Sequence, residues 1–322
     1  MQLTRSPLAA FLALALGLAV PARAAEPITH SFLTTGGETQ IIDAAGKAIW
    51  TYPGGSRDGF VLPNGNVLLA VNKGKDFPGG GVVEVTRDLK RVFEFKGTQS
   101  EVNTAQALAN GNVLLTEAGP KPRLLEVTRE GKIAVEVPLQ AQTANHHLQS
   151  RMARKLPNGN YLVPQLLDRV VREYAPDGKI VWEAKTPDEP KESWPFTAIR
   201  VPNGNTLITC THGAHVIEVD AQGKIVWQLT NQDLAGAPLK DPCGAQRLPN
   251  GNTVICTYGN HAPGIPTFMR EGTPNGLSTM STGVPSARNG RSSSGTILAT
   301  TPLLPWRPAI LSPTSSFCLV AM

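Results

Sequence analysis

The chain has 322 residues, of which 41% are hydrophobic and 17% are charged, and it contains 31 glycines and 27 prolines. The hydrophobic content is sufficient for a buried core, which argues against general disorder, and frequent Val, Ile and Thr beside few Glu and Lys argue against an all-helical protein. The formal net charge of +5 is modest, and we expect no nucleic-acid partner.

The amino terminus has the pattern of a secretory signal peptide. Arg5 precedes the apolar run Leu8–Val20, and Ala22-Arg23-Ala24 resembles a cleavage site. The run is too short to span a membrane comfortably, and no stop-transfer segment follows it. We predict that residues 1–24 are removed, which leaves 28 basic and 25 acidic residues and a net charge of 28 − 25 = +3. The protein is then expected to be periplasmic or secreted, without a transmembrane segment.

A five-residue motif recurs at nearly constant spacing. Its first copy is Leu62-Pro63-Asn64-Gly65-Asn66, and the glycines of successive copies are 46, 48, 45 and 47 residues apart. Pro and Asn favour the first positions of a turn, and the glycine suits the left-handed conformation that closes a three-residue hairpin loop. Each copy is therefore expected to join two antiparallel strands. The later copies begin at Leu108, Leu156, Val201 and Leu248.

A second turn motif lies between the copies of the first. Asp43-Ala44-Ala45-Gly46-Lys47 is followed by Trp50, and related segments end at Trp182 and Trp227. Leu89 replaces the glycine in one weaker copy, so we expect that turn to be strained or different. Short β-branched runs flank both motifs, so each period of about 46 residues holds four strands.

Four antiparallel strands per period are typical of the blades of a β-propeller. We predict an all-β propeller of six blades, with seven as the alternative, because the chain after residue 24 is between six and seven periods long. Residues 29–52 supply the second to fourth strands of one blade, four complete blades follow, and another begins at Cys243. The missing innermost strand must then come from the carboxy-terminal part. Small residues suited to a crowded axis precede the five turns: Gly59, Ala105, Ala153, Ala198 and Ala245.

The segment 261–322 departs from this pattern. It has no lysine, a single acidic residue (Glu271) and neither turn motif, although the register calls for a Gly-Lys-Trp copy near residue 270. We therefore divide the chain into a signal peptide (1–24), propeller repeats (25–260) and this atypical segment. The segment either closes the ring or is an aberrant, poorly ordered tail.

The recurring tryptophans and turns also carry a family resemblance. We expect Trp50, Trp182 and Trp227 to pack between adjacent blades, where large rings bury the most area. The Asp-x-x-Gly-Lys-x-x-Trp copies resemble the tryptophan-docking repeat of the quinoprotein-like (PQQ-like) β-propeller superfamily. The Leu-Pro-Asn-Gly-Asn copies are similar to repeats of exported bacterial propellers, including arylsulfotransferase-like ones. The resemblance covers roughly residues 30–260.

The resemblance implies pyrroloquinoline quinone (PQQ) as a candidate cofactor. Quinone-dependent dehydrogenases of the superfamily generally carry eight blades, an adjacent cysteine pair and a calcium site. This chain is too short for eight blades, and its cysteines are dispersed: Cys210, Cys243, Cys256 and Cys318. The cofactor therefore stays unassigned, and no metal site is predicted. Because repeat alignment puts Cys210 and Cys256 on opposite faces of neighbouring strands, we expect buried thiols rather than a disulfide.

Histidines provide most of the candidate functional residues. His146 and His147 lie just ahead of an inner strand, near Arg151, while His215 and His261 occupy equivalent points of successive repeats. Equivalent loops converge at one end of a propeller axis, so these side chains are expected to line one pocket. Protonated imidazoles would favour an anionic ligand such as a sulfate or carboxylate. The candidate ligand-binding residues are His146, His147, Arg151, Trp194, His212, His215 and His261.

Recurrence itself separates structural from functional candidates. Glu84, Glu126, Glu173 and Glu218 occupy one repeat position, which predicts hydrogen bonds to a neighbouring turn rather than catalysis. Trp194 has no repeat partner and is a candidate for ligand stacking as much as for loop packing.

Three classes of function remain open. We favour an exported, monomeric propeller that binds a small molecule or a protein through its central funnel without catalysis. The alternative is a histidine-dependent transferase or hydrolase, of which arylsulfotransferase-like chemistry is the version that the resemblance implies. A quinone-dependent oxidoreductase is the third class, and no catalytic residue is assigned.

Overall fold

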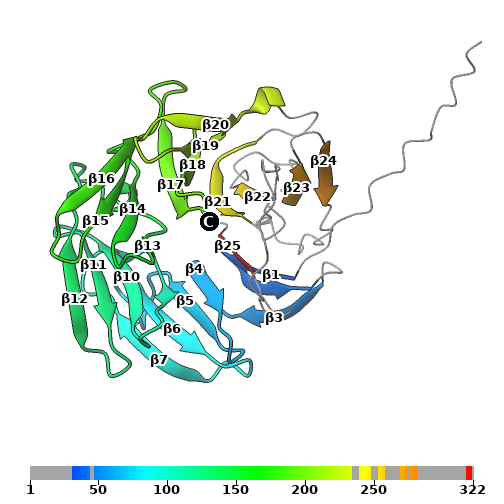
Figure 1. The fold of residues 1–322 in the computed structure, drawn as a ribbon. Helices are drawn as coiled ribbons and strands as arrows, with labels where there is room; N and C mark the ends of the chain where they lie inside the picture. Colours follow the sequence, from blue (N-terminus) through cyan, green and yellow to red (C-terminus); the bar gives the residue numbers. More distant parts are fainter. Residues whose placement is uncertain are drawn as a thin grey trace, which may run out of the picture.

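The computed structural model describes residues 31–43, 47–233, 239–247 and 253–257, and beyond them the backbone of strands at 269–273, 276–280 and 317–320. Within these residues six sheets of four or five strands surround a central axis (Figure 1). The all-β propeller of six blades is therefore confirmed. No helix in the described part of the chain is long and apolar enough to cross a membrane.

Blades one to three come from the first part of the chain. Blade one consists of β25 (Phe317–Val320), β1 (Phe32–Thr35), β2 (Thr39–Ile42) and β3 (Ala48–Tyr52). Blade two consists of β4 (Ser56–Val61), β5 (Val67–Val71), β6 (Gly81–Val85) and β7 (Arg91–Lys96). Blade three consists of β8 (Glu101–Val102), β9 (Gln106–Ala107), β10 (Val113–Ala118), β11 (Arg123–Val127) and β12 (Ile133–Pro138).

Blades four to six follow in the same order. Blade four consists of β13 (Arg154–Lys155), β14 (Tyr161–Gln165), β15 (Val170–Tyr174) and β16 (Ile180–Lys185). Blade five consists of β17 (Ser193–Arg200), β18 (Thr206–His212), β19 (His215–Val219) and β20 (Ile225–Leu229). Blade six consists of β21 (Pro242–Arg247), β22 (Thr253–Thr257), β23 (Met269–Thr273) and β24 (Gly276–Met280). Two short 3-10 helices, η1 (His146–Leu148) and η2 (Asn231–Asp233), lie in connections between blades.

Blade one combines the two ends of the described chain. Strand β25 pairs with β1, with Phe317 opposite Phe32, so the carboxy-terminal part supplies the innermost strand of this blade, as predicted. It runs parallel to β1, whereas the other pairings within the six sheets are antiparallel. A strand that arrives from far along the chain is not held antiparallel by a tight hairpin. Strands β23 and β24 also come from 261–322 and complete blade six. The other residues of this segment and the predicted signal peptide lie outside the described residues, so those parts remain predictions.

The glycine-containing turns adopt the predicted hairpin geometry. In the first copy the Gly65 amide donates to the Leu62 carbonyl oxygen at 2.8 Å, and the Leu62 amide donates to the Asn66 carbonyl oxygen at 2.8 Å. Gly65 has a φ of 86°, in the left-handed region that glycine enters at little cost. Leu89 has a φ of 67° at the corresponding position of the second motif, which confirms that this turn is strained.

The recurring tryptophans lie between neighbouring blades, as predicted. Trp50 of blade one packs among apolar residues of blade two, and its Nε1 donates to the Arg87 carbonyl oxygen at 3.0 Å. Trp182 of blade four packs against blade five, and its Nε1 donates to the Ala221 carbonyl oxygen at 2.8 Å. Trp227 similarly contacts the core shared by blades five and six. Each ring therefore buries area between two blades, and Trp50 and Trp182 also donate to a turn of the next blade.

The recurring glutamates join each blade to the next, and we call these contacts the glutamate clasps. Glu173 accepts hydrogen bonds from Asn158 Nδ2 at 2.9 Å and Asn160 Nδ2 at 2.7 Å, both in the turn of its own blade. It also accepts from Arg200 Nη2 of blade five at 2.7 Å. The structural role predicted from recurrence is confirmed. The corresponding pairs in the other blades are Glu84–Arg129, Glu126–Lys155 and Glu218–Arg247.

The described cysteines are buried in the blades. Cys210 is a free thiol and forms no disulfide with Cys256. Burial raises the pKa of the Cys210 thiol. The prediction of a buried thiol at Cys210 is confirmed, and the residue is chemically inert in this environment.

Candidate functional site

The inner strand of every blade from two to six contains one extra residue at the same point. The register shifts by one between Ser56 and Asp58 in β4, and equivalent shifts occur in β17 and β21. In blades three and four the pairing shifts by one where the inner strand is interrupted. Such β-bulges re-aim a side chain and are frequent beside functional sites. The residues at this point, two before the small residue of each repeat, form what we call the bulge ring: Arg57, Asn103, Arg151, Phe196 and Cys243.

Neighbouring members of the bulge ring contact one another around the axis. Arg57 Nη1 donates to Asn103 Oδ1 at 3.1 Å. Asn103 Nδ2 in turn donates at 3.1 Å to the carbonyl oxygen of Ser150, the residue before Arg151. The guanidinium carbon of Arg151 lies 5.6 Å from the centre of the Phe196 ring. The ring thus combines two guanidinium groups, one amide and one aromatic face within a chain of direct contacts.

Arg151 is the least satisfied of these side chains. It is fully buried, and its Nη1 donates to the Ser150 carbonyl oxygen at 3.0 Å. Among the described residues, its Nε and Nη2 have no hydrogen-bond partner. Burial and the like charge of Arg57, opposed by Glu101, lower the pKa of Arg151 to about 9, so the group stays charged at neutral pH. Two unpaired donors on a buried cation are costly, about 1–3 kcal/mol each, and would be relieved by an acceptor.

Glu101 is an acidic residue in contact with this ring, and three basic side chains surround it. Its carboxylate lies 3.0 Å from Arg57 Nη1, 3.3 Å from Lys73 Nζ and 3.1 Å from His147 Nδ1. Burial alone would raise the pKa of Glu101, but the hydrogen bond from His147 and the charges of Arg57, His147 and Arg151 lower it to about 2. With Arg151 included, cationic groups outnumber this single carboxylate. The local balance therefore favours an additional anion.

The cluster runs from an exposed mouth to a buried interior. The side chains of Lys73 and His147 are 50% and 46% exposed, whereas that of Arg57 is 12% exposed. His146 Nδ1 lies beside this mouth, 2.8 Å from Ser100 Oγ. A ligand from solvent would meet Lys73 and His147 first and the guanidinium groups afterwards.

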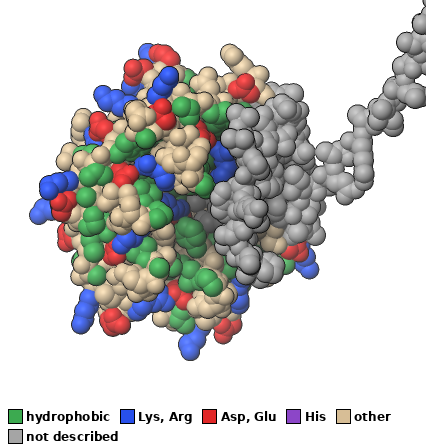
Figure 2. Space-filling view, viewed as in Figure 1, with side chains coloured by type: hydrophobic (Ala, Val, Ile, Leu, Met, Phe, Trp, Pro, Cys, Tyr) green, Lys and Arg blue, Asp and Glu red, His purple; other side chains and the backbone are tan. Residues whose placement is uncertain are grey.

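The mouth and the glutamate clasps lie on opposite faces of the disc. Because strands alternate in direction, the connections between blades share a face with the loops between second and third strands, and the two turn motifs share the other face. His147 lies in the connection between blades three and four, and His212 lies at the end of β18, where the loop to β19 begins. Both are therefore on the face opposite the turn motifs. Figure 2 shows interspersed acidic and basic side chains and a central hollow, but no histidine, on the side in view.

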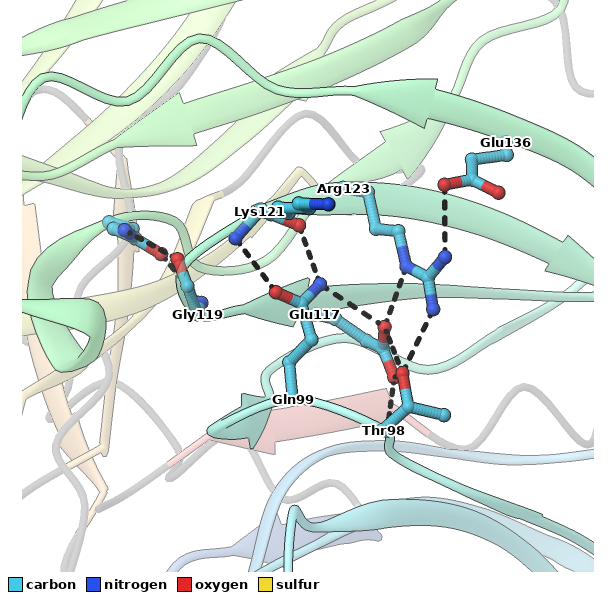
Figure 3. Close-up of polar contacts among 8 residues, drawn as sticks. Thr98, Gln99, Glu117, Gly119, Lys121, Arg123 and Glu136 are labelled. Atoms are coloured by element: carbon cyan, nitrogen blue, oxygen red, sulfur yellow. Dashed lines mark hydrogen bonds and ion pairs between the residues drawn. The ribbon is translucent and has the colours of Figure 1, made fainter.

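A polar network on blade three supports the start of the neighbouring inner strand (Figure 3). The buried Glu117 carboxylate accepts from the Thr98 amide at 2.6 Å and from Arg123 Nε at 2.8 Å. On the same loop the Gly119 amide donates to Gln149 Oε1 at 2.8 Å, and Gln149 Nε2 donates back to the Gly119 carbonyl oxygen at 3.1 Å. Gln149 lies two residues before Arg151, so the network fixes the backbone from which the buried guanidinium extends.

An ion pair across the ring connects blades two and four. Arg154 Nη1 and Nη2 donate to Asp58 Oδ2 at 2.7 Å and Oδ1 at 2.9 Å. The same carboxylate accepts from the Gly59 amide at 3.0 Å and the Ala105 amide at 3.1 Å. This fully bonded pair, adjacent in sequence to Arg57, holds the bulge ring in place and contrasts with Arg151.

The structure divides the predicted site residues into two groups. His146, His147 and Arg151 belong to the cluster around Glu101, whose charges interact. Trp194 and His212 form a second group, with ring centres 4.5 Å apart.

His215 stands apart from both groups. It is 4% exposed, its Nδ1 lies 2.9 Å from the Gly213 carbonyl oxygen, and its Nε2 has no partner. Burial lowers the pKa of His215, which favours the neutral ring. His261 lies outside the described residues. Across the part of the chain that the structure describes, no group of three or more His, Cys, Asp or Glu side chains is placed to hold a metal ion.

Sequence reasoning missed Arg57, Lys73, Glu101 and Asn103, because none of them belongs to a recurring motif. A signal was nevertheless present. Two residues before the small residue of each repeat, the sequence changes from Arg to Asn, Arg, Phe and Cys. A variable position inside an otherwise regular repeat is where a ring of equivalent residues can be adapted to a ligand.

Comparison with solved structures places the fold among β-propellers. A protein of unknown function from Bacteroides caccae is 22% identical over 84% of this chain and 99% of its own, with a TM-score of 0.68. A catalytically inactive virginiamycin B lyase from Staphylococcus aureus, solved with quinupristin, is 14% identical over 84% and 89%, with a TM-score of 0.57. A periplasmic gluconolactonase from Pseudomonas aeruginosa is 12% identical over 79% and 82%, with a TM-score of 0.53. At these identities the likeness shows the fold alone.

These neighbours agree with the predicted propeller fold, while the resemblances to the PQQ-like superfamily and to arylsulfotransferases stay predictions. No curated protein matches the chain. A family profile described as Mal s 1 allergenic protein-like matches residues 61–253, from the end of β4 to the start of β22. This range covers more than half of the sequence, so the chain belongs to the Mal s 1 allergenic protein-like family.

Proposed function

We propose that this protein is an exported propeller that binds a small anionic ligand at the bulge ring. Arg57 and Arg151 bind the anion, and Lys73 and His147 attract it at the mouth. One observation carries the proposal: Arg151 is fully buried and charged, yet no described residue provides an acceptor for its Nε or Nη2. Sulfates, phosphates and carboxylates all supply oxygens that suit a guanidinium fork.

The surrounding charges support an anion rather than a neutral ligand. Glu101 already accepts from Arg57, Lys73 and His147, so its single negative charge is shared among three basic groups. Within the part of the chain that the structure describes, Arg151 has no carboxylate within hydrogen-bond distance. An incoming oxyanion would accept hydrogen bonds from Arg151 Nε and Nη2, and its negative charge would offset the repulsion between Arg151 and Arg57.

Binding of inorganic anions to the purified chain tests the proposal. Isothermal titration calorimetry with sulfate, phosphate and acetate should detect at least one anion, and Arg151→Met should weaken that binding more than about tenfold, the loss expected for a buried charge-assisted hydrogen bond. Arg129→Gln is the matched control, because it removes an equal charge at a glutamate clasp. Absence of binding by all three anions, or equal binding by Arg151→Met and the parent protein, would contradict the proposal.

A second candidate function has one specific observation in its favour. Ser100 Oγ and His146 Nδ1 are 2.8 Å apart at the mouth, a distance at which histidine can accept the proton of a serine nucleophile. The nearby cations would stabilise the anion formed in such a reaction. Labelling by a fluorophosphonate that is lost in Ser100→Ala and in His146→Gln would favour a hydrolase or transferase. No labelling would favour the binding protein.

Export is part of the proposal and has its own test. The charged amino terminus, the apolar run and the Ala-x-Ala pattern support it. Expression of the full chain in a bacterial host should give a periplasmic or secreted protein whose mass corresponds to a start at Ala25. A full-length protein in the cytoplasmic fraction would contradict export and leave the anion site unaffected.

A further inference from the structure

Trp194 differs from the structural tryptophans in what its polar edge does. Trp50 Nε1 and Trp182 Nε1 each donate to a carbonyl oxygen in the neighbouring blade. Trp194 Nε1 has no acceptor among the described residues, and the ring is only half-buried. It lies instead against His212, with ring centres 4.5 Å apart and planes inclined by 40°. The pair presents an aromatic surface that the packing of the blades does not use.

Trp194 occupies a repeat position whose counterpart in blade three contacts an arginine of the bulge ring. Trp194 lies four residues before the small residue of its repeat, the position that Glu101 holds in blade three. Glu101 contacts Arg57, the bulge-ring residue of the preceding blade, at 3.0 Å. The bulge-ring residue that precedes Trp194 in the same way is Arg151. The contact between Arg151 and Phe196, two residues after Trp194, agrees with this placement.

The backbone around the pair is held in an unusual conformation. Glu192, His212 and Ala214 have φ values of 66°, 60° and 52°, in the left-handed region that residues other than glycine seldom occupy. The His212 amide is held by Asp241 Oδ1 of blade six at 3.0 Å. Strained residues of this kind cluster at ligand-binding segments. The strain supports a surface shaped for a ligand.

We infer that the ligand is an aromatic anion, whose flat ring stacks on Trp194 and His212 while its charged group binds Arg151. This inference rests on the proposed anion site and specifies the ligand class. A ring stacked on one tryptophan face contributes a modest part of the affinity, about fivefold. An aliphatic anion of the same charge and size would keep the interaction with Arg151 and lose the stacking.

Benzoate and cyclohexanecarboxylate separate these contributions, because they share a carboxylate and differ in the flatness of the ring. In calorimetric titrations the parent protein should bind benzoate about fivefold more tightly. In Trp194→Leu the two affinities should become equal, with that for cyclohexanecarboxylate changed less than about twofold. His212→Ala provides the same comparison if the first variant does not fold. Tyr52→Leu is the control, since it removes an aromatic ring from the Trp50–Tyr52 stack of blade one.

Each outcome has a distinct meaning. Equal affinities in the parent protein, or a preference for benzoate that survives in Trp194→Leu, would overturn the aromatic subsite while the anion site stands. Binding of neither carboxylate, together with no binding of sulfate or phosphate, would instead overturn the proposed function. A loss of the preference in Tyr52→Leu would also count against the inference, because it would show that the effect is not local.

Discussion

The charged residues of the glutamate clasps and of the bulge ring differ in how completely they are hydrogen-bonded. On the face with the turns, each clasp glutamate is bonded both to an asparagine of its own blade and to a cation of the next, as Glu173 is to Asn160 and Arg200. At the bulge ring, by contrast, Arg151 is fully buried with two donors unpaired. The first arrangement recurs in four blades, and the second occurs once.

This difference teaches how to separate structure from function inside a repeat protein. Each clasp stabilises the interface between two blades. Because these interfaces are equivalent, a residue type that stabilises one of them stabilises the others and recurs. A ligand at the axis contacts several blades at once and needs different chemistry from each of them. We therefore propose Arg151 as a ligand-binding residue because it departs from the repeat and because, among the described residues, it lacks the partner that recurrence supplies elsewhere.

Removal of a clasp should have the largest effect on stability. Glu126 is buried, pairs with Lys155, and accepts from Tyr161 Oη at 2.5 Å. Glu126→Ala leaves both donors without their acceptor, so we expect the free energy of unfolding to fall by about 3 kcal/mol. Urea unfolding measures the change.

Glu94→Ala is the control for this prediction. Glu94 pairs with Arg91 on the surface, where both side chains are about 40% exposed. Exposed pairs contribute little, so we expect a change below about 0.5 kcal/mol. Equal effects of the two substitutions would show that the clasps do not hold the blades together.

Protonation of Glu101 should have the next largest effect. Its pKa of about 2 is lower than in the unfolded chain, so the ionised form stabilises the fold. That contribution is complete above about pH 4.5 and is lost as the pH falls toward 2, with about 2 kcal/mol already lost at about pH 3. Unfolding free energies measured from pH 6 to pH 2.5 should therefore fall less steeply in Glu101→Gln than in the parent protein.

A matched glutamate tests whether this slope belongs to the cluster. Glu94→Gln changes an exposed carboxyl on β7 and should leave the pH dependence of unfolding close to that of the parent protein. Parallel curves for Glu101→Gln and the parent protein would mean that Arg57, Lys73 and His147 do not hold the carboxylate in its ionised form.

The sequence was sufficient for the fold because the features that build it recur. The turn around Gly65, the docking of Trp50 and the clasp at Glu173 each follow from a residue type that returns at the same repeat position. The parallel direction of β25 could not be predicted, because no turn motif connects it to β1.

The site was predictable only in part, for a physical reason. His146, His147 and Arg151 were found because histidine and arginine are chemically distinctive near an inner strand. Arg57 and Glu101 were missed, because their roles depend on a one-residue bulge and on contacts between blades 44 residues apart in sequence. The choice between His215 as a surface ligand and as a buried residue depends on local packing that spacing does not reveal.

Replacement of Arg151 should affect stability in the opposite direction from loss of a clasp. Arg151→Met removes two unpaired buried donors and a buried charge, and loses the bond to Ser150 and the contact with Phe196. Replacement of buried charge by an apolar side chain of similar volume is often stabilising, so we expect a gain of about 1 kcal/mol without ligand. Thermal unfolding with and without added anion measures both effects: the variant should melt higher alone and gain nothing from the anion. A fall in stability of more than about 2 kcal/mol would identify Arg151 as a structural residue.

Relief of the strained turn at Leu89 should have the smallest effect. Leu89 has a φ of 67° and is 42% exposed, whereas Gly131, Gly178 and Gly223 occupy the corresponding positions of other repeats with φ values of 79°, 86° and 77°. This conformation costs a residue with a Cβ about 1–2 kcal/mol. Glycine avoids that cost, but its greater loss of conformational entropy on folding offsets part of the stabilisation. Leu89→Gly should therefore stabilise the protein by about 0.5–1 kcal/mol, and Leu89→Asn, which tolerates the same backbone region, should give a similar gain.

The reciprocal change Gly131→Leu should cost a comparable amount, because nothing lies within 4 Å of a Cβ built there and only the backbone conformation opposes it. A loss of stability in both Leu89 variants would mean that the leucine side chain makes a contact that outweighs the strain, and the turn face would then contain a residue selected for more than closing its hairpin.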